Sequence, residues 1–134
     1  MASYLSQHLM MDKEELLSFM SDSSKCAQIG FSPATLPSLF IPNTYYIYWD
    51  ISVDHFIERM QVEYLKFWNE ERLQKAEACH LTPIEVCTLA SIVDEETANA
   101  AEKPDVAGMY LNRLHVGMPL QADPTVKFAI GDFT

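Results

Sequence analysis

Three prolines in the second half of the chain each stand beside a residue suited to begin a helix. Thr82-Pro83-Ile84-Glu85 combines a threonine cap, a proline at the first helical position and a glutamate three residues after the cap, which is the pattern of a capping box. Lys103-Pro104-Asp105 and Asp123-Pro124 provide similar starts. We therefore predict helices from Pro83 to about Glu96, from Lys103 to about His115, and from Asp123 towards Ile130.

The first 80 residues also favour helices. Asp12-Lys13-Glu14-Glu15 places acidic residues in a first helical turn, where they interact favourably with the helix dipole. Ser52 is suited to cap a longer helix, whose apolar residues recur at helical spacing: Phe56, Met60, Tyr64 and Phe67. We predict short helices over residues 2–9, from residue 12, and over 25–29, then a long helix from Ser52 to about Trp68 and a polar helix over 70–79.

Residues 43–50 are the exception, because Asn-Thr-Tyr-Tyr-Ile-Tyr-Trp-Asp is aromatic and β-prone. We predict a strand there, and hence an α+β fold that is mostly helical with a small β element around residues 43–50. Its aromatic residues would form one core face and one surface face of the strand: Tyr45, Tyr46, Tyr48 and Trp49. The functional alternative is a platform on which a sugar ring stacks.

Composition excludes several classes of protein. Apolar residues make up 49% of the 134 residues, which suffices for a core, and the net charge of −10 argues against nucleic-acid binding. Three cysteines do not make a disulfide framework, and we expect Cys79 and Cys87 to be buried apolar residues. The sequence has neither a run of about 18 apolar residues nor an N-terminal signal peptide, so we expect the chain as given to be soluble.

Glu96, at the end of the helix predicted to begin at residue 83, is a charged residue on the apolar side of that helix. It lies three residues after Val93 and seven after Leu89, so it continues the apolar stripe of that helix. The stripe consists of Val86, Leu89, Ala90 and Val93. Burial, the negative end of the helix dipole and the like charges of Asp94 and Glu95 would all favour the protonated carboxyl group, which general-acid catalysis requires. The alternative is a frayed helix end with three solvated acids.

The remaining polar residues favour structural roles. Glu102 and Asp105 lie near a helix start, and Asp123 is suited to cap one. The histidines are scattered, at positions 8, 55, 80 and 115, and the spacing of Cys79, His80 and Cys87 matches no zinc motif. We therefore expect neither a metal nor a cofactor.

Ordered blocks between Leu81 and Gly131 closely resemble the core signature of a known family. They are Leu89-Ala90-Ser91-Ile92-Val93, Glu96-Thr97, Asn112-Arg113-Leu114, Gly117-Met118, Leu120-Gln121 and Asp123-Pro124-Thr125-Val126. The family is that of the YceG-like (MltG) endolytic peptidoglycan transglycosylases, whose Phe-Pro-Asp-Thr-Tyr segment also resembles Phe40-Ile41-Pro42-Asn43-Thr44-Tyr45. In that family the acid/base glutamate directly precedes a threonine. This maps to Glu96, the residue that periodicity also singles out.

The resemblance implies cleavage of the β-1,4 bond between N-acetylmuramic acid and N-acetylglucosamine inside a glycan strand, which leaves a 1,6-anhydromuramoyl end. Glu96 would act first as acid and then as base. Substrate contacts would come from Asn112, Arg113, Gln121, Asp123 and Thr125. The implied partners are peptidoglycan glycan strands and cell-wall synthesis proteins. The implied location is the extracytoplasmic face of the bacterial cytoplasmic membrane, where family members are anchored.

The family sequence also contains an N-terminal membrane span, and later Tyr-Asn-Thr-Tyr and Gly-Leu-Pro-Pro-Gly stretches, all of which this chain lacks. We therefore predict an N-terminal helical segment with the aromatic strand over residues 1–50, and the first half of a catalytic region over 51–134. Two other functions stay open. One is a non-catalytic module that binds glycan or partner proteins, and the other is a muramidase-type hydrolase that uses Glu96 with Asp94 or Asp123.

Overall fold

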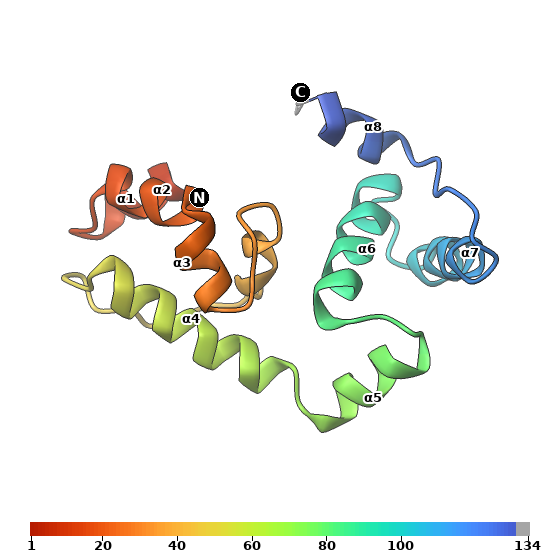
Figure 1. Ribbon diagram of the computed structural model, residues 1–134, viewed down its shortest axis with the longest axis horizontal. Coiled ribbons are helices and arrows are strands. Elements are labelled where there is room, and N and C mark those ends of the chain that lie inside the picture. Colours follow the sequence, from red (N-terminus) through yellow and green to blue (C-terminus); the bar gives the residue numbers. More distant parts are fainter. Residues whose placement is uncertain (131–134) are drawn as a thin grey trace. The chain divides into compact units, whose positions relative to one another are not determined.

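A computed structural model describes residues 1–130, which form helices joined by irregular segments (Figure 1). The last four residues of the predicted catalytic region, 131–134, lie outside the described residues. The elements in chain order are α1 (Ala2–His8), α2 (Lys13–Ser21), α3 (Ser23–Gln28), the short 3-10 helix η1 (Leu36–Leu39), α4 (Val53–Phe67), α5 (Glu70–Ala78), α6 (Pro83–Glu96), α7 (Lys103–His115) and α8 (Asp123–Ile130). The predicted helices are confirmed, with boundaries that differ by a few residues.

Side-chain caps explain where several helices begin. The Asp12 carboxylate accepts a hydrogen bond from the Glu14 amide at 3.2 Å at the start of α2, and the Ser52 hydroxyl accepts one from the His55 amide at 3.3 Å at the start of α4. At the start of α6 the Thr82 hydroxyl accepts from the Glu85 amide, while the Glu85 carboxylate accepts from the Thr82 amide. These bonds satisfy amides that the first turn of a helix leaves without partners.

The predicted strand over residues 43–50 is wrong, and so is the α+β class. Residues 1–130 contain no strand, so this part of the chain is predominantly helical. A strand needs a paired neighbour, and no second segment of the sequence is comparably β-prone. Instead, the segment is held in place by a bond from the Met10 amide to the Trp49 carbonyl at 2.8 Å and one from the Tyr45 hydroxyl to the Ile41 carbonyl at 2.5 Å.

Residues 1–72 form one compact unit, in which α2 contacts α1, α3 and α4, and η1 packs against α4. Helices α2 and α4 direct their apolar faces into a shared core. The buried members of that core are Ala2, Met11, Leu16, Phe19, Cys26, Leu36, Leu39, Val53, Phe56, Ile57 and Met60. Burial raises the pKa of the Cys26 thiol, an effect to which the nearby Asp22 adds.

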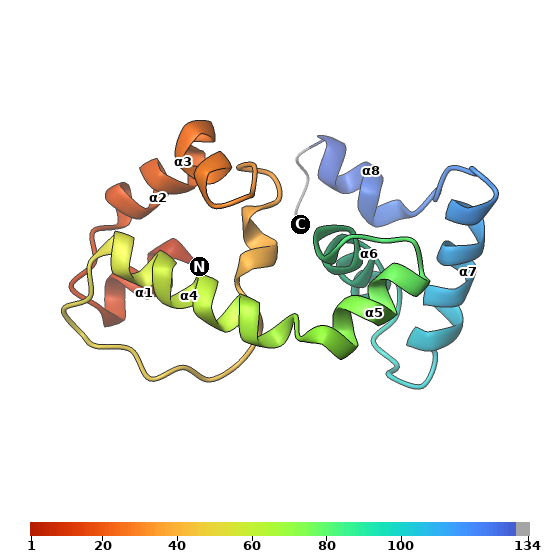
Figure 2. The same ribbon diagram turned by 60° about the horizontal axis from the view of Figure 1, so that its bottom comes forward.

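Residues 73–130 belong to a second compact unit, in which α7 and α8 both pack against α6, as two views of the ribbon show (Figures 1 and 2). Its buried residues are Leu89, Ile92 and Val93 of α6, Tyr110 of α7, and Ala122 just before α8. Cys79 and Cys87 are only half-buried, contrary to expectation, and neither is among the residues of this small core. The division between the units falls within α5. Our boundary at residue 50 concerned the extent of a catalytic region, and it stays a prediction.

Candidate active site

Glu96 is the last residue of α6, and its side chain is exposed. The expectation that it faces the packed side, away from water, is therefore wrong. The stripe itself is close to the prediction, since Leu89 and Val93 are buried, but Ile92 takes the place predicted for Ala90, which is exposed. The stripe simply runs past the edge of the core at its last turn, so Glu96 meets water on one side.

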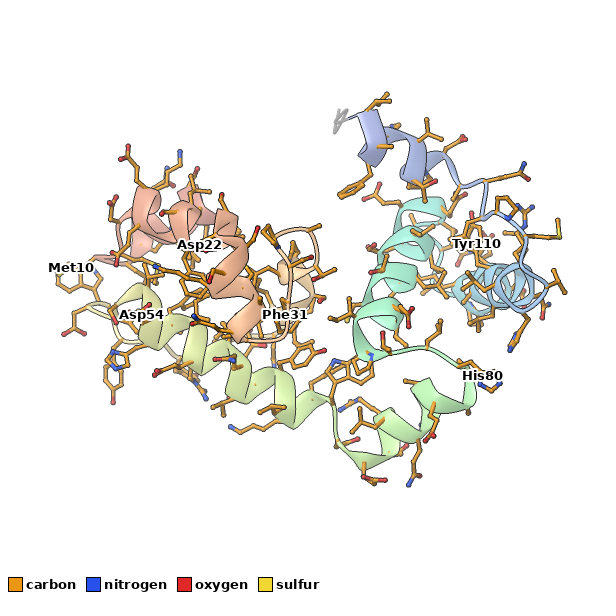
Figure 3. All side chains as sticks on the ribbon, viewed as in Figure 1. Met10, Asp22, Phe31, Asp54, His80 and Tyr110 are labelled. Atoms are coloured by element: carbon orange, nitrogen blue, oxygen red, sulfur yellow. The ribbon has the colours of Figure 1, made fainter. Side chains whose placement is uncertain are left out.

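A buried phenol meets Glu96 on its other side. The Tyr110 hydroxyl donates a hydrogen bond of 2.9 Å to Oε1 of Glu96, and the Tyr110 side chain is only 3% exposed. Figure 3 labels Tyr110 where α6 and α7 face one another. Burial raises the pKa of Tyr110, and the hydrogen bond to Glu96 and its charge raise it further. The phenol therefore stays protonated through neutral pH and remains a donor to the carboxylate.

Two charges surround this pair. The positive charge of Arg113 lowers the pKa of Tyr110, and the negative charge of Asp123 raises it, so both lie within electrostatic reach of the phenol. Residues 110 and 113 are three apart on α7 and share a face of that helix. Arg113 and Asp123 of the second unit thus act electrostatically on the hydroxyl that Tyr110 donates to Glu96. Sequence analysis missed Tyr110. The available signal was its spacing from Arg113.

The connection from α6 to α7 is fixed by a separate polar cluster. Its centre is the Glu102 carboxylate, which accepts hydrogen bonds from the Thr97 hydroxyl at 2.9 Å and from the Asn99 side-chain amide at 3.0 Å. Asp94 forms an ion pair with Lys103, at the start of α7. Glu102 and Asp94 therefore have structural partners, and Glu96 is the acid of this region that contacts the buried tyrosine.

Arg113 and Thr125, two of the residues expected to contact substrate, bind the protein backbone. Nη1 of Arg113 donates to the Leu120 carbonyl at 2.6 Å, and the Thr125 hydroxyl donates to the Ala122 carbonyl at 2.6 Å. Both residues shape the segment that leads into α8, which contains Gln121 with a left-handed φ of 53°. They are therefore better suited to positioning that segment than to touching a sugar.

Gln121, Asp123 and Asn112 are exposed. Gln121 also receives a long bond of 3.4 Å from Arg113. Asp123 is the first residue of α8 rather than the residue before it, so the predicted cap is displaced by one position.

Asn112 and Arg113 line a shallow, open depression along α7 together with Pro104, Asp105, Gly108, Met109, Val116 and Met118. Glu96 is not among its lining residues, and no hydrogen bond joins Asn112 to Glu96 or Tyr110 within residues 1–130.

Within residues 1–130, no group of three or more histidine, cysteine, aspartate or glutamate side chains is arranged to hold a metal ion. The same part of the chain contains no helix of the length and apolar character that crossing a bilayer requires.

A family model described as the YceG-like family matches residues 1–134. The chain belongs to this family. It is 32% identical over 85 residues to the endolytic murein transglycosylase of Bacillus subtilis (strain 168), in a match that covers 61% of this chain. It is 38% identical over 52 residues, or 39% of its length, to the protein of the same name from Streptococcus pneumoniae serotype 2 (strain D39 / NCTC 7466). The family resemblance noted in the sequence is confirmed.

This YceG-like chain is similar to a minor part of each relative. The matches cover 22% of the Bacillus subtilis protein and 9% of the Streptococcus pneumoniae protein. No solved structure matches the chain significantly.

Proposed function

We propose that this chain carries the acid/base glutamate of an endolytic murein transglycosylase, and that Glu96 is that residue. Support comes from the family, from the names of the two relatives, and from the geometry at the end of α6. The observation that carries the proposal is the exposed Glu96 carboxylate held at one oxygen by a buried tyrosine hydroxyl. An exposed carboxyl group is open to a sugar, and a fixed one is oriented for proton transfer.

A single carboxyl group is sufficient for the proposed reaction. Protonated Glu96 gives its proton to the glycosidic oxygen as the bond between that oxygen and C1 of N-acetylmuramic acid breaks. The resulting carboxylate takes the proton of the same sugar's 6-hydroxyl, whose oxygen bonds to C1 and closes the 1,6-anhydro ring. The carboxyl group ends protonated, as it began, and no water is consumed. A hydrolase would need a second carboxylate at a defined distance.

We propose two different roles for the five residues that the sequence predicts to contact substrate. Asn112, Gln121 and Asp123 are exposed and are proposed to contact the glycan, whereas Arg113 and Thr125 are proposed to position the segment before α8. The proposed substrate is the peptidoglycan glycan strand, and cell-wall synthesis proteins are proposed partners. The proposed site of action is the extracytoplasmic face of the cytoplasmic membrane.

A pair of glutamine substitutions tests the assignment. We expect Glu96→Gln to abolish the release of anhydro ends from uncrosslinked glycan while the far-ultraviolet circular dichroism stays unchanged, because an amide cannot donate the proton. Glu95→Gln is the matched control, an exposed neighbour on the same helical turn, and should retain activity. Wild-type rates in Glu96→Gln would show that Glu96 is not the acid.

A module that binds glycan without cutting it is the second candidate, and one observation favours it. Tyr46, Tyr48 and Trp49 are 96%, 83% and 64% exposed, although Tyr45 and Ile47 in the same segment pack against the core of the first unit. Exposed aromatic rings held on an ordered segment are suited to bind a partner. If this candidate is correct, glycan retains the wild-type chain without being cut, and the triple alanine variant of the three residues is not retained.

A further inference from the structure

The hydroxyl of Tyr110 is not needed to fill the core. Its ring packs among the buried residues of the second unit, with Leu89, Ile92, Val93 and Ala122, and a phenylalanine ring would occupy the same space. The hydroxyl instead donates a hydrogen bond of 2.9 Å to Oε1 of Glu96, whose side chain is exposed. This hydroxyl therefore binds one of the two oxygens of the proposed catalytic carboxylate.

The two oxygens of Glu96 are not equivalent. Oε1 receives the tyrosine hydroxyl, and within residues 1–130 no donor is found for Oε2. Because Glu96 is exposed, Oε2 is the oxygen that a sugar hydroxyl or a glycosidic oxygen is free to approach. The carboxyl group is thereby divided into an oxygen that is held and an oxygen that can react.

We propose that Tyr110 is the positioning residue of Glu96: its hydroxyl holds Oε1, so that both proton transfers with the glycan pass through Oε2. This inference rests on the proposed function and deepens it. The proton leaves Oε2 for the glycosidic oxygen, negative charge then spreads over both oxygens, and the phenol stabilises the share on Oε1. Oε2 then receives the proton of the 6-hydroxyl, which restores the acid.

The charged residues near the Glu96–Tyr110 pair have other roles or other partners. Arg113 on α7 and Asp123 at the start of α8 act on the phenol with opposite signs. On α6 itself, Asp94 is paired with Lys103, and Glu95 is exposed. None of these described groups replaces the phenol as a donor to Glu96, so the removal of one hydroxyl leaves the carboxylate without a protein donor among residues 1–130.

The test is Tyr110→Phe, which removes the hydroxyl and keeps the ring. Loss of the hydroxyl removes the hydrogen bond that holds Oε1, so the carboxyl group of Glu96 loses its fixed orientation. The carbon-13 chemical shift of the Glu96 carboxyl carbon at neutral pH reports this loss in protein with labelled glutamate, with Glu96→Gln to assign the signal, and it requires no enzymatic activity. In turnover, we expect kcat to fall about tenfold with KM little changed, because the bond strengthens as negative charge develops in the transition state.

Tyr45→Phe is the matched control, because Tyr45 also has a partly buried ring and donates its hydroxyl, but to the Ile41 carbonyl in the first unit. It should change neither the carbon-13 shift of the Glu96 carboxyl group nor kcat. An unchanged carbon-13 shift in Tyr110→Phe would overturn the inference, and so would a changed shift with wild-type kcat. Activity in Glu96→Gln would instead overturn the proposed function. Loss of activity in Glu96→Gln alongside normal behaviour of Tyr110→Phe would overturn the role of Tyr110 alone.

Discussion

At the scale of single residues, the buried phenol links protonation to stability. The pKa of Tyr110 is raised above its ordinary value of 10.0, first by burial and then by the bond to Glu96. The folded state thus binds this proton more tightly than the unfolded chain does. The resulting stabilisation is complete below pH 10.0 and is lost as pH rises through the higher pKa of the folded state.

We therefore predict that the free energy of unfolding declines less steeply above about pH 10 in Tyr110→Phe than in the wild type, because phenylalanine has no proton to lose. Urea denaturation at several alkaline pH values measures this difference. Burial also raises the pKa of Tyr45, with a smaller effect of Glu63, so Tyr45→Phe should remove a separate and additive part of the decline. Equal alkaline losses in the wild type and Tyr110→Phe would contradict the prediction.

The position of Glu96 was predictable from the sequence, whereas its surroundings were not. Helical spacing fixes which side of α6 each residue occupies, and this placed Glu96 in line with Leu89 and Val93. It does not fix how far the core extends along the helix, which depends on where α7 and α8 cross it. Tyr110 escaped notice for the same reason, because a tyrosine on the apolar face of a helix looks like any core residue until its hydroxyl has a partner.

At the scale of helices, the start of α6 is the feature best defined by local sequence. We predict that Thr82→Ala lowers the free energy of unfolding by about 1 kcal/mol, because the variant loses the acceptor for the Glu85 amide. Chemical denaturation measures the change. Thr88→Ala is the control, since the Thr88 hydroxyl donates to the Ile84 carbonyl within the same helix and caps nothing. A smaller loss in Thr82→Ala than in Thr88→Ala would show that the cap does not stabilise α6.

The same cap makes the stability of α6 depend on pH in the acidic range. Hydrogen bonds from the amide and then the hydroxyl of Thr82 lower the pKa of Glu85 below its ordinary value of 4.5. Because the pKa is lowered in the folded state, ionised Glu85 stabilises the fold above pH 4.5. This stabilisation is lost as pH falls through the pKa of Glu85 in the folded state. We predict that thermal unfolding of Glu85→Gln depends less on pH over this acidic range than that of the wild type. Identical acid profiles would exclude the effect.

Helices were predictable and the strand was not, because the two depend on contacts of different range. A cap such as Ser52 or Thr82 acts within four residues, so the sequence alone contains the whole interaction. A strand over residues 43–50 depends on a partner elsewhere in the chain, and β-propensity says nothing about whether one exists. Tyr46 and Tyr48 therefore point to solvent rather than forming the outer face of a sheet.

At the scale of the whole molecule, the proposed chemistry belongs entirely to the second unit, residues 73–134, because Glu96, Tyr110, Arg113 and Asp123 all lie in it. The first unit contributes the exposed aromatic segment on which the second candidate function rests. Membership of the YceG-like family was predictable, because ordered motif blocks survive where overall identity is low. The role of the aromatic segment was not, because it depends on which rings the core leaves exposed.

The central claim is that one carboxyl group breaks the glycan strand without water. Digestion of uncrosslinked glycan in water enriched in the heavy oxygen isotope, followed by mass spectrometry of the new ends, tests it most directly. We predict N-acetylmuramic acid ends that are lighter than hydrolysed ends by one water and carry no heavy oxygen. Ends that incorporate the heavy isotope would identify a hydrolase with a second carboxylate, and the absence of any new end would identify a module that binds glycan without cutting it. Either result would contradict the proposed transglycosylase reaction.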